Sequence, residues 1–346
     1  MLARAKKTGT RLIPHFKTHQ SKEIGKLFRD KGVEAITVSS VKMAEYFAAC
    51  GWHDITIAFP VNVLEVSKLN ELLSQGVQLK LLVNHLESLA VLEAELRGKA
   101  ALFIEVDAGY NRSGISADHT AEIEVMAEAI IRSDKMTFYG LYYHPGNTYY
   151  AGSIEEIRQI WELSIRKLNL VKEKLGKYRK ALTIRMGDTP GCTVVEDMAG
   201  VDEIGPGNFV FYDLVMSSLG VCSVHAIAVA VACPVVAKNE QRKEIIIHGG
   251  AVHFSKDHLF DEGGEKFFGE MIILEESGWS TVAGDAKLKS VSQEHGILKV
   301  DDELFDKVCL GDIVGILPIH SCLTANLMKS YLSLDGQQLE HLEKVF

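Results

Sequence analysis

The chain has 346 residues, of which 47% are apolar and 24% charged, the composition of a folded protein with a substantial core. Its net charge of -9, without a long run of lysines and arginines, argues against nucleic acid or an anionic membrane as partner. No apolar segment approaches the roughly 20 residues that span a bilayer, and residues 1–9 lack the apolar stretch of a secretory signal. We therefore expect a cytoplasmic protein with a small-molecule partner. Six cysteines without a CxxC pair predict no disulfide framework.

From residue 11 to about residue 215, short apolar segments alternate with amphipathic stretches whose apolar residues recur every three or four positions. This alternation predicts parallel strands joined by helices, in either a closed barrel or an open doubly wound sheet. Eight repeats over about 205 residues favour a (β/α)₈ TIM-type barrel. The predicted strands are residues 11–16, 34–38, 55–59, 79–83, 101–107, 136–144, 182–188 and 202–213.

After residue 218 the sequence becomes β-rich and has no long helical pattern. Apolar segments of strand character lie at residues 224–237, 243–255, 269–276, 288–300 and 312–322. We therefore predict two domains, a barrel over residues 1–218 and a mostly antiparallel β domain over residues 219–346.

Polar residues follow several of the predicted barrel strands, and active-site groups of such barrels lie at the C-terminal ends of the strands. Lys17 follows the first strand, Arg112 follows the fifth, and the sixth ends in Tyr143 and His144. The last two strands carry the glycine-rich turns GDTPG and GPGN, which contain Thr189, Gly207 and Asn208. Clustered backbone N–H groups beside a hydroxyl are typical of a phosphate site.

A lysine, an arginine and a phosphate cradle at one end of a barrel suggest pyridoxal phosphate. Its aldehyde forms a Schiff base with an amine, and its phosphate needs an anchor. Each feature alone has a plainer interpretation, because a lysine at a strand end is often a surface residue and a glycine-rich turn is often only a turn.

Seven segments also occur in an order that resembles a known family. They are PHFKTH (14–19), VDAGYNRSG (106–114), YYHPGN (142–147), GDTP (187–190), GPGNFVFYD (205–213), SQEHG (292–296) and PIHSC (318–322). Together they resemble the metal-activated D-serine dehydratase and D-threonine aldolase family, which is related to alanine racemase and belongs to the fold type III pyridoxal phosphate enzymes. The resemblance covers nearly the whole chain. It implies a barrel followed by a β domain, a D-amino acid substrate and a homodimer.

The resemblance also implies roles for the residues at the strand ends. Lys17 becomes the Schiff-base lysine, Arg112 lies near the ring hydroxyl, and His144 lies beside the ring. The implied phosphate-binding residues are Thr189, Gly207 and Asn208. Alanine racemases have an arginine at the position of Gly205, where it pairs with the pyridine nitrogen. Because that arginine is missing here, we predict Tyr143 as the partner of the nitrogen and consider racemase activity less favoured.

The motif PIHSC places His320 and Cys322 two positions apart. On a strand these side chains point to one face, so both reach a single ion, and imidazole with thiolate suits Zn²⁺. An isolated HxC pair is weak evidence, but the resemblance places the metal ligands in this motif, with Mn²⁺ as the alternative ion. It also associates HxC with D-serine dehydratases, whereas D-threonine aldolases tend to have a carboxylate in the second position. Ile319 stands where a polar residue is common.

The predicted function is a pyridoxal phosphate-dependent lyase of D-β-hydroxy amino acids, assisted by a divalent metal. D-serine would give pyruvate and ammonia. The same ligands would allow D-threonine to be cleaved to glycine and acetaldehyde, so an aldolase is the second interpretation. A racemase and a non-catalytic cofactor carrier come after these, and the β domain counts against a carrier because carriers are single barrels. We assign no catalytic role to His15 or His19, and His295 is a weaker candidate for lining the site.

Overall fold

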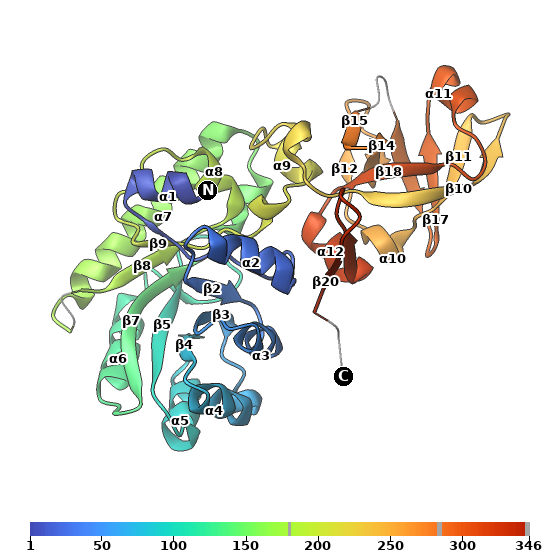
Figure 1. Ribbon diagram of the computed structural model, residues 1–346. Helices are drawn as coiled ribbons and strands as arrows, with labels where there is room; N and C mark the ends of the chain where they lie inside the picture. Colours follow the sequence, from blue (N-terminus) through green and yellow to red (C-terminus); the bar gives the residue numbers. More distant parts are fainter. Residues whose placement is uncertain (179–180, 282–285, 343–346) are drawn as a thin grey trace. The chain divides into compact units, whose positions relative to one another are not determined.

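The computed structural model describes residues 1–178, 181–281 and 286–342. It divides into two compact units, residues 1–209 and 210–346 (Figure 1). The predicted boundary at residue 218 falls inside the second unit, because helix α9 (Leu214–Ser218) is anchored there. Leu214 shares a buried cluster with Leu317, and the Asp213 carboxylate accepts a hydrogen bond from the Ser321 backbone N–H. Among the described helices, none has both the length and the apolar character needed to cross a membrane.

A parallel sheet forms the first unit, with strands in the order β1-β9-β8-β7-β5-β4-β3-β2. A parallel bridge between His15 and Thr37 joins the chain after β1 to β2 and links the two ends of this path. The predicted eight-stranded barrel is therefore confirmed, with a short extra strand, β6 (Ile115–Ser116), beside β5. The eight strands are β1 (Arg11–Leu12), β2 (Ala35–Val38), β3 (Asp54–Pro60), β4 (Gln78–Val83), β5 (Ala100–Asp107), β7 (Met136–Tyr143), β8 (Thr183–Met186) and β9 (Glu203–Ile204).

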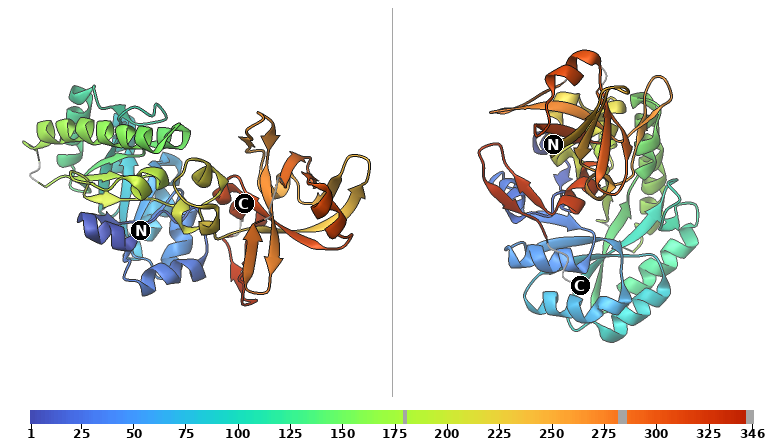
Figure 2. Two further views of the ribbon diagram at one scale, coloured as in Figure 1. Left: turned by 90° about the horizontal axis from the view of Figure 1, so that it is seen from above. Right: turned by 90° about the vertical axis from the view of Figure 1, so that its right-hand side faces the viewer.

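Helices surround this curled sheet (Figure 2), and serine side chains define where several of them begin. The hydroxyls of Ser21, Ser40 and Ser153 accept hydrogen bonds from the backbone N–H groups three residues later, which satisfies an otherwise unpaired donor of the first turn. The elements of this unit are α1 (Leu2–Thr8), α2 (Lys22–Asp30), α3 (Val41–Ala49), α4 (Val66–Ser74), α5 (Leu86–Glu95), α6 (Thr120–Ile131), α7 (Ile154–Leu175), α8 (Thr189–Val194) and the 3₁₀ turns η1 (Val63–Glu65), η2 (Gly146–Tyr150) and η3 (Asn208–Val210).

Two layers of side chains fill the barrel unit, because parallel strands are buried on both faces. The larger layer lies between the strands and the helices and includes Phe16, Leu102 and Trp161. The smaller layer contains Leu82, Phe103 and Tyr142. The guanidinium of Arg185 lies against this smaller layer, 6.0 Å from the ring of Phe103 and 5.7 Å from that of Tyr142.

An antiparallel sheet forms the second unit, in the order β15-β14-β16-β17-β11-β10-β18. A further pairing of β14 with β18 closes six of these strands into a ring. The predicted antiparallel β domain is thus confirmed. The strands are β10 (Val231–Asn239), β11 (Glu244–His248), β14 (Gly269–Glu275), β15 (Gly278–Thr281), β16 (Lys287–Val291), β17 (His295–Lys299) and β18 (Ile313–Pro318), with two separate hairpins, β12 (Leu259–Phe260) with β13 (Lys266–Phe267) and β19 (Ser330–Leu332) with β20 (Gln338–Glu340).

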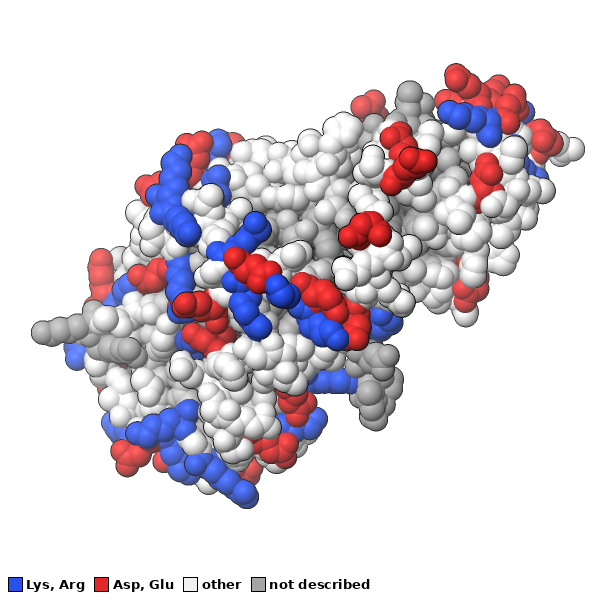
Figure 3. All heavy atoms as spheres, viewed as in Figure 1, with Lys and Arg blue, Asp and Glu red and all other residues white. Residues whose placement is uncertain are grey.

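Short helical segments connect these strands. They are η4 (Val224–Ala226), α10 (Ala251–Phe254), α11 (Asp302–Lys307) and α12 (Ser321–Met328). Helix α10 packs on α12, which follows β18. On the face drawn in Figure 3, acidic and basic side chains are interspersed and form no large patch of one sign.

Candidate active site

Lys17 is an exposed residue in an otherwise buried stretch at the end of the first barrel strand. Its backbone N–H donates a hydrogen bond to Nδ1 of His15 at 3.4 Å. Phe16, which is fully buried, packs against the rings of His19 and Phe47 with centroid distances of 4.4 and 5.0 Å. His19 therefore has a packing role, and the backbone on both sides of the lysine is firmly held. The result is one accessible amine on a rigid segment.

His144 follows β7 and is oriented by a hydrogen bond. Its Nδ1–H donates to the carbonyl oxygen of Gly187 at 2.9 Å, so that in the neutral imidazole Nε2 has a lone pair and no proton. The centroid of the His144 ring lies 6.0 Å from that of the Tyr110 ring. The guanidinium of Arg112 lies 5.3 Å from the centroid of the same Tyr110 ring. Tyr110, which the sequence did not single out, thus contacts both predicted residues.

Burial and positive charge keep two imidazoles neutral at this place. Burial, then Lys17 and Arg112, lowers the pKa of His144 to about 3, although the Gly187 hydrogen bond acts in the opposite direction. The pKa of His15 is lowered well below its usual value by burial and by the charges of Lys17 and Arg185. Three cationic side chains therefore act on two neutral rings, and this concentration of positive charge suits an anionic ligand.

The predicted phosphate cradle is assembled from the two glycine-rich turns. Thr189, at the start of α8, accepts a hydrogen bond from the Phe209 backbone N–H through Oγ1 at 3.2 Å. Its own backbone N–H donates to the phenol oxygen of Tyr149 at 3.3 Å, which adds a residue that the sequence did not indicate. Gly207 fits tightly, because a Cβ there would lie 2.9 Å from the carbonyl oxygen of His15 and 3.0 Å from Oγ1 of Thr18. Asn208 is buried and follows directly.

The two tyrosines at the end of β7 belong to different layers. Tyr143 lies in the large cluster between the strands and the helices, and burial raises its pKa, a shift that the nearby Ser164 of α7 opposes. Tyr142 lies in the smaller cluster with Phe103. Alternation along a strand explains this difference, since adjacent side chains point to opposite faces. The side chain of Tyr143 is therefore directed to the helical layer, and this placement gives no support to its predicted contact with a ring nitrogen.

The metal pair in the second unit differs from the expected geometry. We predicted that His320 and Cys322 lie on one strand, but β18 ends at Pro318, His320 is the N-cap residue of α12, and Cys322 lies in the first turn of that helix. The side chains are nevertheless close enough for a hydrogen bond between them. Ile319, which stands where a polar residue was expected, is 2% exposed and packs with Leu317.

Asp257 orients the imidazole of His320. Its Oδ2 lies 3.0 Å from Nδ1 of His320, so an Nδ1–H donates to the carboxylate and Nε2 is left for a metal. Burial by itself would lower the pKa of His320, but the hydrogen bonds to Asp257 and Cys322 outweigh burial and raise it to about 10. The Ser255 hydroxyl accepts from the Asp257 backbone N–H at 3.1 Å, and Ser255 has a φ of 69°, which only a constrained turn maintains in a residue other than glycine.

Asp213 supports the same motif from another side. It is 1% exposed and accepts hydrogen bonds from the backbone N–H of Ser321 at 3.0 Å and from the Ser321 hydroxyl at 3.3 Å. Its other oxygen caps α9 through the Met216 backbone N–H at 3.1 Å. Asp213 thereby fixes the residue between His320 and Cys322. Neither supporting acid was predicted from the sequence.

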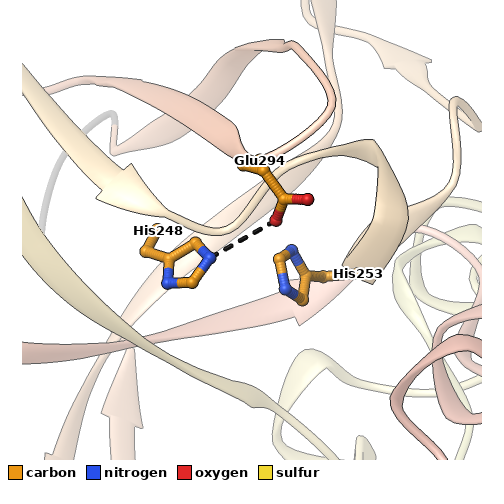
Figure 4. Close-up of side chains that lie close together, drawn as sticks. All are labelled: His248, His253 and Glu294. Atoms are coloured by element: carbon orange, nitrogen blue, oxygen red, sulfur yellow. Dashed lines mark hydrogen bonds and ion pairs between the residues drawn. The ribbon is translucent and has the colours of Figure 1, made fainter.

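A second cluster of ligand-type residues contains His248, His253 and Glu294, whose candidate ligand atoms lie within 4.8 Å of one another (Figure 4). His248 Nε2 is 3.4 Å from Glu294 Oε2. His253 is unsuited to a metal in this arrangement, because its Nδ1 accepts the Gly250 backbone N–H at 3.1 Å and its proton must then lie on Nε2. His295, the weaker sequence candidate, is exposed and pairs with His248 across the sheet.

Comparison with known families divides the chain in the same way as the fold. The family model described as "Alanine racemase, N-terminal domain" matches residues 1–214, and the one described as "Putative serine dehydratase domain" matches residues 228–334. The first match covers the barrel, including the segment of Lys17. The second covers the segment that contains His320 and Cys322.

Relatives with assigned activities match almost the entire chain. D-threo-3-hydroxyaspartate dehydratase of Delftia sp. (strain HT23) is 28% identical over 349 residues, covering 95% of this chain and 88% of the relative. D-serine dehydratase of Dictyostelium discoideum is 28% identical over 365 residues, covering 96% and 88%. The solved structure of the Delftia enzyme superposes with a TM-score of 0.91 at 28% identity, covering 99% of this chain and 93% of that one. One solved cysteine-to-alanine variant of that enzyme is described as its metal-free form.

Proposed function

Because the chain belongs to the alanine racemase-like family of metal-activated D-serine dehydratases and D-threonine aldolases, we propose that it is a pyridoxal phosphate-dependent dehydratase of D-β-hydroxy amino acids. Its proposed reaction converts D-serine into pyruvate and ammonia. The observation that carries the proposal is the surroundings of Lys17, an exposed amine beside two buried imidazoles whose pKa values are lowered by burial and by the neighbouring cations.

The residues near Lys17 fit pyridoxal phosphate. The cofactor needs an amine for its aldehyde, a site for a dianionic phosphate and neighbours for its ring. Lys17 supplies the amine. Thr189, Gly207 and Asn208 supply a hydroxyl and backbone N–H groups for the phosphate, and a side chain at position 207 would clash with His15. Tyr149 joins this group through the Thr189 backbone N–H.

When bound, pyridoxal phosphate supplies an electron sink for negative charge at the substrate's Cα. In our proposal, Lys17 Nζ removes the α-proton and afterwards carries it as an ammonium. His144 does not act as the acid, because its Nδ1–H is bonded to Gly187 and a pKa of about 3 leaves Nε2 unprotonated at neutral pH. Its role is to accept a hydrogen bond beside the ring. Arg112 provides a permanent positive charge that favours an ionised ring hydroxyl.

His320 and Cys322 would hold a divalent metal, for which imidazole and thiolate favour Zn²⁺, with Mn²⁺ as the alternative. Such an ion acts as a Lewis acid on the β-oxygen and makes expulsion of hydroxide easier. The chain's own contribution is to present the ligands. Asp257 holds the imidazole in the tautomer with Nε2 available, and the first turn of α12 places Cys322 within hydrogen-bond reach of that imidazole.

We propose D-serine as the first substrate to test and D-threo-3-hydroxyaspartate as the second. Both are considered because relatives named for each substrate are equally similar to the chain. The thiol at position 322 argues against a D-threonine aldolase, in line with the sequence-based expectation. A homodimer remains part of the proposal and is testable by light scattering.

The test is a product assay with purified protein, pyridoxal phosphate and Zn²⁺. We expect pyruvate from D-serine and none from L-serine, which serves as the matched stereochemical control. Oxaloacetate formed faster from D-threo-3-hydroxyaspartate would select the second substrate, and acetaldehyde from D-threonine would indicate the aldolase. Bound cofactor without any of these products would contradict the lyase and favour the carrier.

A further inference from the structure

Arg185 is a fully buried cation in the barrel, and the proposed function gives it no task. It lies on β8, is 1% exposed, and was not singled out from the sequence. A guanidinium cannot lose its charge inside a protein, so it needs compensating partners when it is buried. Those partners, and the one donor that lacks a partner, indicate what it does. The inference rests on the proposed use of pyridoxal phosphate.

The two terminal nitrogens of Arg185 are engaged. Nη1 donates to the Thr56 hydroxyl at 2.7 Å and lies 3.7 Å from Oε2 of Glu203. Nη2 donates to the Ile13 carbonyl at 3.2 Å and to the Thr37 hydroxyl. These contacts fix the guanidinium on strands β2, β3 and β9 and on the residue that follows β1, so its orientation is well defined.

Nε of Arg185 is buried, and among residues 1–178, 181–281 and 286–342 it has no hydrogen-bond acceptor. Leaving a charged donor unpaired in the interior is unfavourable, because the group has lost its hydrogen bonds to water without gaining one in the protein. Such an atom is rare unless a ligand supplies the acceptor. The missing acceptor must be small and must reach the barrel interior.

Gly205 lies directly next to the guanidinium of Arg185. A Cβ at position 205 would be 3.5 Å from Nη2 and 3.6 Å from Nε of Arg185, so the guanidinium occupies the place toward which a side chain at 205 would extend. Two residues further along, Gly207 contacts His15 and Thr18 on either side of Lys17. The segment 205–207 therefore connects the surroundings of Arg185 with those of the proposed Schiff-base lysine.

Electrostatics link the same groups. Arg185 acts on His15, which also feels Lys17 and Arg112, and it acts on the phenol of Tyr142. The buried acids of the barrel are the alternative ring partners, and each has one oxygen already engaged, although Oδ1 of Asp188 and Oε2 of Glu203 have no hydrogen-bond partner among the described residues. Each accepts a hydrogen bond already, in the pairs Glu105 with Ser113, Asp188 with Thr148 and Glu203 with Tyr139.

The pyridine nitrogen of pyridoxal phosphate is held in proteins by an aspartate or an arginine. We propose that Arg185 is that residue here, with its Nε–H as the donor to the ring nitrogen. A permanently charged donor keeps the nitrogen unprotonated, since a second proton at the same place is excluded by charge repulsion. Arg185, on the strand next to Gly205, thereby takes the place of the side chain that Gly205 lacks. The partner is not Tyr143.

This arrangement has a chemical consequence. An unprotonated ring withdraws electrons less strongly than a protonated one, so the ring alone stabilises negative charge at Cα less well. Departure of the β-hydroxyl would then depend more on a Lewis acid, which agrees with the ligand pair of His320 and Cys322.

The experiment uses the full chain reconstituted with pyridoxal phosphate labelled with ¹⁵N in the ring. We expect the wild-type ¹⁵N resonance at the position of an unprotonated pyridine and unchanged between about pH 6 and 9, because the arginine never titrates in that range. The test variant is the double substitution Arg185→Gln with Glu203→Gln, which avoids leaving a buried carboxylate unpaired. We expect its resonance to move upfield as the pH falls, and its Kd for pyridoxal phosphate to rise about 10-fold, the scale of losing one charge-assisted hydrogen bond.

Arg11→Gln is the matched control. Arg11 also lies 3.7 Å from Glu203, but its side chain is 46% exposed, so its loss should leave both the resonance and the Kd unchanged. A folded double variant with the wild-type resonance and Kd would overturn the inference and make Arg185 a purely structural residue. If that variant fails to fold, the wild-type resonance still decides, because a protonated ring nitrogen contradicts the inference and leaves the lyase proposal intact. Failure of the wild-type chain to bind pyridoxal phosphate would instead overturn the proposed function.

Discussion

The barrel unit and the β unit build their candidate sites in opposite ways. In the barrel, Lys17, Arg112, His144 and Thr189 are far apart in the chain and converge because the strands that carry them form one ring. In the β unit, His320 and Cys322 are two residues apart, and it is their supports, Asp257 and Asp213, that are distant in the sequence. Convergence in the barrel follows from topology. In the β unit, the orientation of the His320 imidazole and of the backbone beside it depends on hydrogen bonds from Asp257 and Asp213, which the topology does not specify.

If the barrel holds the cofactor and the β unit holds the metal, each can be removed separately. Lys17→Ala should lower dehydratase activity by about 10³-fold or more, the scale of losing a general base, and should abolish the visible absorbance of lysine-bound cofactor. Zinc content should stay at the wild-type level. Lys26→Ala, an exposed lysine on α2, is the control and should change neither. Cofactor absorbance that persists in Lys17→Ala would contradict this part of the comparison.

The converse change is Cys322→Ala. Loss of a Lewis acid that contributes several kcal/mol should lower turnover by about 10²–10³-fold, while the cofactor absorbance remains. Zinc content measured by atomic absorption should fall. Cys309→Ala removes an exposed thiol at another position and should behave like wild type. Full activity of the Cys322→Ala protein after chelation would show that the β unit has no metal role.

The support from Asp257 can be tested without removing a ligand. Asp257→Asn should weaken zinc binding by about 10–100-fold. The neutral amide is a weaker acceptor than the carboxylate for the Nδ1–H of His320, so the imidazole is oriented less firmly. Titration with Zn²⁺ followed by calorimetry measures this Kd. Glu262→Gln, an exposed residue of the same unit, is the control. Equal zinc affinity in Asp257→Asn and wild type would mean that the hydrogen bond does not orient the ligand.

The last prediction concerns the free energy of unfolding and the buried cap of α8, and it needs neither turnover nor a bound ligand. Burial raises the pKa of Asp188 to about 7 from an ordinary value of 3.8, so between these pH values the folded state holds a proton that the unfolded state has lost. The free energy of unfolding should therefore fall as the pH rises from about 4 to 7, by at most about 1.4 kcal/mol per pH unit, and level off above that. In Asp188→Asn this contribution should disappear. Urea unfolding of the cofactor-free proteins at several pH values measures it, and identical slopes would contradict the burial argument.

Much of the barrel could be predicted because its signal is periodic. Alternating apolar segments identified all eight strands, and the rule that functional groups follow strand ends indicated Lys17, Arg112 and His144. The layer in which Tyr143 lies could not be predicted, since a strand directs two adjacent tyrosines to opposite faces and the sequence does not say which one faces the helices. Tyr149 was not noticed because it lies in a 3₁₀ turn whose direction only the fold reveals.

The β unit shows what a short motif leaves undetermined. The HxC spacing indicated His320 and Cys322, but the assumption of a strand was wrong because the chain starts helix α12 directly after His320. Asp257 lies 63 residues earlier in the chain, and no spacing rule connects it with a histidine so far away. Arg185 has the same character in the barrel. An arginine in an apolar strand was visible in the sequence, but its unpaired Nε and its position beside Gly205 were not.

The central claim is that the amine of Lys17 anchors the cofactor in the barrel. It is tested most directly by reducing the reconstituted protein with borohydride, digesting it and locating the pyridoxyl group by mass spectrometry. Our account predicts the group on the peptide that contains Lys17 and on no other peptide. A pyridoxyl group on a different lysine, or on none, would contradict it.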